Sequence, residues 1–251
     1  VTLKGVKISD FITQNALPAG PLSNDPVTWT GTDADERYVS GGGDDVLDGG
    51  KGDDEILSGA GNDTIEGERG NDIIYGGEGN DVITDEDTDS WSAQKLYGEG
   101  GDDTITGAGY IYGGDGNDTI LANDGDSRID AGDGNNSITV DGANWVDHIE
   151  AGAGHDTITV EDGGVGGINT GGGDDVVNIK DTVQWWISLG EGDDTITFNG
   201  NWDHWDGVSL DNGDDIVDVS DWEGSRDSNH NVYGGSGDDT YIGRDVDKTN
   251  N

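Results

Sequence analysis

A nine-residue pattern repeats five times without interruption over residues 40–84. The units read SGGGDDVLD, GGKGDDEIL, SGAGNDTIE, GERGNDIIY and GGEGNDVIT, so that position 4 is Gly, position 6 is Asp and position 8 is aliphatic in every unit. Because Gly tolerates positive φ, the first six positions predict a tight turn, and positions 7 to 9 predict a short strand whose position-8 side chain points inward. One unit cannot bury its own apolar residue, so the pattern predicts stacked coils of two units each.

The turn of each unit is rich in oxygen ligands. A Gly-rich backbone can aim several carbonyl oxygens into a turn, and Asp at position 6 adds a carboxylate. Carbonyl and carboxylate oxygens are the ligands that the hard cation Ca²⁺ prefers. The residues themselves therefore predict calcium binding at the turns.

The repeats resemble those of the repeats-in-toxin (RTX) family of secreted bacterial proteins, whose nonapeptides form a calcium-binding parallel β-roll. The resemblance implies that each ion lies between turns on the same side of successive coils. It also implies a structural role for such a segment, although toxins, proteases and lipases carry similar repeats. The expected fold is all-β, a right-handed parallel β-roll or β-helix solenoid.

Beyond residue 84 the register breaks and then resumes from Gly98 with longer and shorter coils. Taking every second unit predicts about eleven coils, with calcium turns along one edge of the solenoid, the first edge. The position-6 residues of this edge are Asp45, Asp63, Asp81, Asp103, Asp118, Asn136, Asp156, Asp175, Asp194, Asp215 and Asp239. We expect on the order of ten calcium ions here, with a weaker site where Asn136 replaces Asp.

The opposite, second edge keeps the calcium pattern only at Asp54 and Asp72. Elsewhere this edge is expected to consist of loops of variable length, and the acidic run over residues 85–89 is interpreted as a solvated loop, with one more ion as the alternative. Six tryptophans belong to this part of the coils: Trp145, Trp185, Trp186, Trp202, Trp205 and Trp222. They either close the edge with apolar area or form a surface that binds sugar rings or a partner.

Composition limits the possible partners. The chain carries a net charge of −44 with only 30% hydrophobic residues, a balance typical of disorder unless cations neutralise the carboxylates. Folding should therefore be coupled to calcium binding. Such a polyanion is not expected to bind nucleic acid or an anionic membrane, and no apolar run is long enough to span a bilayer. The chain has no Cys, which excludes disulfides and thiol catalysis.

Three regions are expected along the chain. Residues 1–37 hold all three prolines and are interpreted as an N-terminal cap or linker, with the tail of a preceding domain as the alternative. Residues 38–242 form the solenoid, and residues 243–251 form a C-terminal tail or linker. A cap would protect the end of the solenoid from pairing with other chains.

These expectations combine into one functional hypothesis. The chain is interpreted as a non-enzymatic, calcium-binding structural module of a secreted or cell-surface bacterial protein, such as a surface layer, filament or adhesin. It would be exported by type I secretion, as the resemblance implies, and would fold on reaching millimolar calcium. Its partners would be calcium ions and neighbouring subunits or other domains of the same precursor. The alternative is a carbohydrate-binding module that uses the Trp-rich edge to bind polysaccharide and is attached to a polysaccharide-active enzyme.

Overall fold

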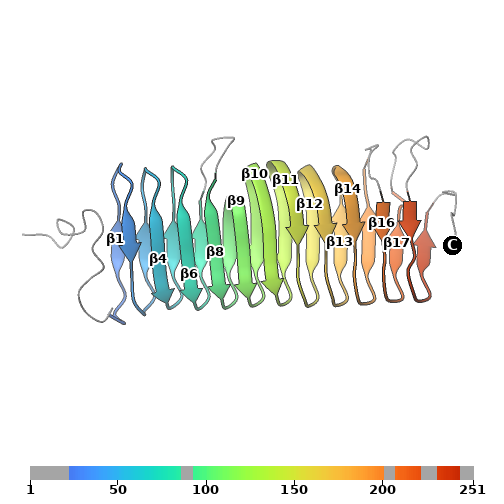
Figure 1. Ribbon diagram of the computed structural model, residues 1–251, viewed down its shortest axis with the longest axis horizontal. Helices are drawn as coiled ribbons and strands as arrows, with labels where there is room; N and C mark the ends of the chain where they lie inside the picture. Colours follow the sequence, from blue (N-terminus) through green and yellow to red (C-terminus); the bar gives the residue numbers. More distant parts are fainter. Residues whose placement is uncertain (1–22, 86–92, 201–206, 222–230, 244–251) are drawn as a thin grey trace, which may run out of the picture.

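The computed structural model describes residues 23–85, 93–200, 207–221 and 231–243, and these residues form strands and turns without any helix. The strands wind into a single parallel β-solenoid whose coils stack along the long axis of the molecule (Figure 1). Every strand pairs in parallel with the equivalent strand of the next coil. The predicted fold class, an all-β parallel solenoid, is confirmed.

Two ladders of paired strands form the two walls of the solenoid. The first wall contains β1 (Thr28–Thr30), β3 (Val46–Asp48), β5 (Thr64–Glu66), β7 (Val82–Thr84), the first parts of β9 (Thr104–Asp115), β10 (Thr119–Asp133), β11 (Ser137–Glu150) and β12 (Thr157–Asn169), then β13 (Val176–Ile179), β15 (Thr195–Phe198), β17 (Ile216–Asp218) and β19 (Thr240–Ile242). The second wall contains β2 (Arg37–Val39), β4 (Glu55–Ala60), β6 (Ile73–Glu78), β8 (Lys95–Gly100), the later parts of β9 to β12, then β14 (Val183–Ser188), β16 (Gly207–Ser209) and β18 (Asn231–Tyr233).

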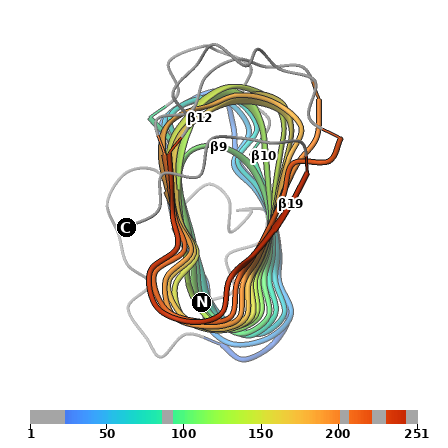
Figure 2. The ribbon, with the colours of Figure 1, turned by 90° about the vertical axis from the view of Figure 1, so that its right-hand side faces the viewer.

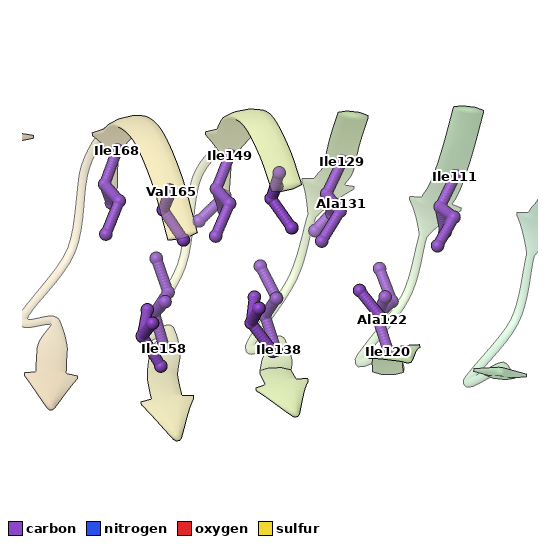
Figure 3. Packing of buried hydrophobic residues seen from close by; sticks show 14 of the residues in the cluster. Ile111, Ile120, Ala122, Ile129, Ala131, Ile138, Ile149, Ile158, Val165 and Ile168 are labelled. Carbon is purple, nitrogen blue, oxygen red and sulfur yellow. The ribbon is translucent and has the colours of Figure 1, made fainter. Parts of the chain in front are cut away.

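The hydrophobic core is a pair of aliphatic columns that face each other between the walls. Position-8 residues pair in register from coil to coil, for example Leu47 with Ile65 and Ile65 with Ile83. Figure 3 shows Ile138 and Ile158 on one wall turned toward Ile149 and Ile168 on the other, and all four side chains are fully buried. β-Branched side chains suit such a pleated wall. The view along the axis shows the two walls facing each other across every coil (Figure 2).

A core truncation is expected to destabilise the calcium-loaded solenoid. Replacing Ile138 by Ala should lower the free energy of unfolding by about 2–5 kcal/mol, because the neighbouring coils cannot collapse into the space it leaves. The matched control is Val176→Ala, since Val176 points outward and is 38% exposed. Its cost should be about 0.5 kcal/mol. Denaturant titration at saturating calcium measures both, and equal costs for the two variants would contradict this account of the core.

The solenoid begins one coil earlier than the spacing of the repeats indicated. Strand β1 pairs with β3, so that Trp29 is the partner of Leu47 in the preceding coil. The Trp29 ring stacks on the Tyr38 ring, with 4.5 Å between the ring centroids. Trp29 follows no Gly-Asp turn, which is why the repeat pattern does not reveal it. Residues 1–22 and 244–251 lie outside the described residues, so a cap before β1 and a tail after the last coil stay predictions.

The two edges differ from each other, as expected, but part of the second edge consists of strands where loops were expected. Tight, uniform turns lie along the lower border of Figure 1, which is the first edge. Along the upper border, the expectation of loops is wrong for the middle of the solenoid. There β9 to β12 continue across the second edge as paired strands of 12 to 15 residues, with register shifts in β10 and β11 that absorb the different coil lengths.

Candidate metal centres

The position-6 carboxylates of the first edge form a continuous ladder. One oxygen of each, Oδ1, accepts a hydrogen bond from the backbone N–H of the position-6 residue one coil earlier. Asp63 Oδ1 accepts from Asp45 N–H at 2.7 Å, and Asp81 Oδ1 accepts from Asp63 N–H at 2.7 Å. The same bond recurs in every coil as far as Asp239, which accepts from Asp215 N–H at 3.2 Å. The ladder thus places all of the predicted first-edge residues in one row.

The carboxylates are buried although they are acidic. Every predicted ligand on either edge is at most 2% exposed, except Asp239, which is exposed in the last described coil. The second oxygen, Oδ2, accepts no hydrogen bond at Asp54, Asp81, Asp103, Asp118, Asp194 and Asp215. A buried carboxylate oxygen without a partner is costly, and a bound cation would supply that partner.

Backbone carbonyl oxygens converge on the same places. A Cβ atom on Gly49 would lie 2.8 Å from Asp54 Oδ2 and 3.0 Å from the carbonyl oxygen of Gly67, which belongs to the following coil. Gly76, Gly98 and Gly113 leave the same kind of space between a carboxylate and a carbonyl oxygen of the next coil. In these four turns, glycine at position 1 therefore leaves room beside the carboxylate for a ligand sphere made of oxygen atoms.

The electrostatics of the ladder favour a bound cation. Burial raises the pKa of Asp81, Asp103, Asp156 and Asp194 to about 7, although the hydrogen bond from the preceding coil works in the opposite direction. The pKa of Asp54 rises to about 6 for the same reason. The ionised carboxylates that calcium requires are thus disfavoured by their surroundings until a positive charge compensates them.

The ligand sets draw mainly on the backbone. Within the described ranges, no three side chains of His, Cys, Asp or Glu gather closely enough to hold a metal ion by themselves. Each turn instead combines one carboxylate with the carbonyl oxygens around it. A sphere built from carbonyl and carboxylate oxygens fits a hard cation such as Ca²⁺, so the residues present fit the predicted ion.

The second edge repeats the ladder where the sequence predicted it. Asp54 Oδ1 accepts from Glu36 N–H and Asp72 Oδ1 accepts from Asp54 N–H, each at 2.7 Å. The following turn of this edge begins at Asp85. The expectation of a solvated loop is wrong for this residue, because it is only 1% exposed. Gln94 Nε2 donates to Asp85 Oδ1 at 2.8 Å.

Asp85 extends the oxygen-rich region of the second edge. A Cβ atom on Gly67 would lie 2.9 Å from Asp72 Oδ2 and 2.8 Å from Asp85 Oδ2. Counting back from the buried Leu96 at position 8 gives position 6 to Gln94. Counting forward from Thr84, which is position 9 of the preceding unit, gives position 1 to Asp85, a signal that was present in the sequence. The rest of the acidic run, residues 86–89, lies outside the described residues.

A second ladder, at position 5, escaped the sequence analysis. Its side chains accept hydrogen bonds from the following coil, opposite in direction to the position-6 ladder: Asp44 Oδ1 accepts from Asn62 N–H at 3.0 Å, and Asn62 Oδ1 accepts from Asn80 N–H at 2.8 Å. His155 takes the same part, with Nδ1 accepting from Asp174 N–H at 2.8 Å. The signal was the restriction of this position to Asp, Asn or His throughout the first edge. The two ladders together fix the spacing of neighbouring turns.

Three of the six predicted edge tryptophans lie among the described residues. The Trp145 ring covers Gly164, the Trp185 ring approaches Gly166, and the Trp186 ring approaches Gly167, so that the indoles of β11 and β14 lie against the glycines of β12. Trp185 and Trp186 nevertheless remain 45% and 43% exposed. Trp202, Trp205 and Trp222 lie outside the described residues. These indoles therefore pack against the glycines of β12 and also present apolar area to solvent.

These features define a calcium-binding β-solenoid. The family model of the RTX calcium-binding nonapeptide repeat matches residues 30–65, 58–84, 95–109, 112–144, 146–164 and 231–246, which together exceed half of the chain. The chain belongs to this family, whose repeats bind calcium and typically serve as structure rather than as catalysts. No curated protein and no solved structure matches the chain. None of the described residues forms a helix that could cross a membrane.

Proposed function

We propose that this chain is a calcium-dependent structural module of a secreted or cell-surface bacterial protein, such as a surface layer, filament or adhesin. The observation that supports the proposal most directly is the buried carboxylate ladder, in which the second oxygens of residues such as Asp81, Asp103 and Asp118 accept no hydrogen bond and lie beside backbone carbonyl oxygens. The ligands are the position-6 residues named in the sequence analysis, on the order of ten ions in all. Catalysis plays no part in this role.

Export explains why a protein would use ions as structural components. With a net charge of −44, the chain cannot stack its turns at the low calcium concentration of the cytosol and remains unfolded for type I secretion. Millimolar calcium outside the cell matches the weak affinity range of extracellular calcium sites. The ions then complete the fold where the protein is needed.

The experiment is a calcium titration read by bound-ion count and by light scattering after size-exclusion chromatography. We expect on the order of ten calcium ions per chain, bound in the millimolar range of extracellular modules, and calcium-dependent self-association or docking to neighbouring domains of the precursor. Binding of fewer than a few ions would contradict the ladder as a calcium site. A loaded chain that stays monomeric at all concentrations would contradict self-assembly as its role.

A second candidate function rests on the exposed faces of Trp185 and Trp186. Flat aromatic area beside polar groups suits stacking on sugar rings, so the alternative is a carbohydrate-binding module attached to a polysaccharide-active enzyme. Adding polysaccharides to the calcium-loaded monomer should then change its tryptophan fluorescence, and Trp185→Ala should abolish the change. The matched control is Tyr110→Ala, whose side chain is equally exposed, at 44%, on β9.

A further inference from the structure

Asn136 holds the place of an acidic residue in the position-6 ladder. Its side chain is buried, at 2% exposed, and it keeps both ladder bonds. Oδ1 accepts from Asp118 N–H at 2.9 Å, and its own N–H donates to Asp156 Oδ1 at 2.7 Å. The turn at Asn136 therefore has the same backbone arrangement as its two neighbours.

The amide nitrogen of Asn136 points at backbone oxygen atoms. Nδ2 donates to the carbonyl oxygens of Gly132 at 3.2 Å, Gly134 at 3.4 Å and Ala151 at 3.1 Å. The first two carbonyls belong to positions 2 and 4 of the same turn, and the third belongs to position 1 of the next coil. Because Oδ1 is committed to the Asp118 N–H, the hydrogen-bond network itself sets the orientation of the amide.

The neighbouring turns have an oxygen atom where Asn136 has this nitrogen. At Asp118 the corresponding atom is Oδ2, which is buried and accepts no hydrogen bond. A carboxylate oxygen and carbonyl oxygens repel one another unless a cation lies between them, whereas the N–H groups of an amide satisfy the carbonyls directly. The positive end of the amide dipole thus compensates the carbonyl oxygens of this turn, as a bound cation would in the neighbouring turns.

We propose that Asn136 closes its turn with its own amide group in place of a calcium ion, so that the solenoid has one ion-independent turn near its middle. The inference rests on the proposed calcium function and replaces the expectation of a weaker ion site there. The turn lies among β9 to β12, where the strands are also the longest. Coils on both sides of Asn136 can therefore stack on each other without calcium at that point.

The test is the number of calcium ions bound by Asn136→Asp, compared with the wild-type chain by native mass spectrometry at saturating calcium. We expect one more ion than in the wild type, because the new carboxylate recreates the ligand set of the other turns. The matched control, Asp118→Asn, should bind one ion fewer. An unchanged count in Asn136→Asp would overturn the inference, since the turn would already hold an ion.

A second variant keeps the inference testable if Asn136→Asp folds poorly. Asn136→Ala removes the amide without adding charge, and the calcium-loaded chain should bind as many ions as the wild type. Loss of one ion in this variant would overturn the inference. A wild-type chain that binds no calcium at all would instead overturn the proposed function itself, so the two failures are distinguishable.

Discussion

Removal of calcium is expected to convert the β-rich solenoid into a disordered chain. Stacked carboxylates recur at the coil spacing of about 4.8 Å. At that distance two unit charges repel by about 3 kcal/mol at an effective dielectric constant of 20. A coil offers in return two buried aliphatic side chains, each worth about 2 kcal/mol, which must also offset the conformational entropy of some 18 residues. Without cations the repulsion outweighs the narrow core.

Circular dichroism of the metal-stripped protein, followed by calcium addition, measures this transition. At neutral pH, the β signal should be lost in chelator and return cooperatively in the millimolar range that extracellular calcium modules use. Magnesium at the same concentration is the matched control, because it demands octahedral geometry and retains its water, and should restore little structure. A monovalent salt of equal ionic strength separates screening from specific binding. A β-rich spectrum that is unchanged in chelator would show that the aliphatic columns suffice alone.

The periodic parts of the molecule were predictable because each repeat contains both an inward aliphatic side chain for the core and an acidic side chain for the turn. Position 8 supplies the column that contains Leu47 and Ile65, and position 6 supplies the ladder that contains Asp63 and Asp81. The column arises because every strand has one inward side chain, and the ladder arises because every turn has one acidic side chain. A single fixed register accounts for these residues, so no knowledge of tertiary contacts was needed.

The parts that escaped prediction depend on contacts between coils rather than on the pattern within one unit. Trp29 joins the first wall through pairing with β3, with no turn signal of its own. Asp85 lies buried between Gln94, which donates a hydrogen bond to it, and Gly67 of the preceding second-edge turn. The position-5 ladder was visible as a restriction to Asp, Asn or His, but its meaning lies in hydrogen bonds to the following coil. Asn136 was read as a weakened Asp, whereas its nitrogen atom introduces a donor.

The difference between the edges follows from the same ladders. On the first edge, two side-chain ladders run in opposite directions and hold each turn to the next, which leaves no freedom in turn length. On the second edge the ladders end early, and pairing of β10 with β11 absorbs extra residues through register shifts. Long connections and indole rings therefore accumulate on that edge without disturbing the register of the core.

Acidification is expected to act in opposite directions with and without calcium. Burial raises the pKa of Asp103 from 3.8 to about 7, and Asp81 and Asp194 behave alike. Without calcium, the folded chain binds protons that the unfolded chain has lost, so this contribution to stability is fully present below about pH 4 and is lost as pH rises through about 7. With calcium, protons and ions compete for the same carboxylates, so stability rises with pH over the same window.

The folded fraction of metal-stripped protein between pH 4 and 8, followed by circular dichroism, and thermal unfolding at saturating calcium over the same range test the two signs. Asp103→Asn removes one titrating group and should flatten the calcium-free pH dependence, while Asp115→Asn, an exposed acid in the adjacent turn, should leave the slope nearly unchanged. Comparing the two variants separates the buried ladder from the general loss of negative charge in acid, because both remove one charge. If calcium-free stability rose with pH, the carboxylates would be stabilised as anions by the protein itself. The ladder would then need no cation, and the coupling between ion binding and folding would have to arise elsewhere.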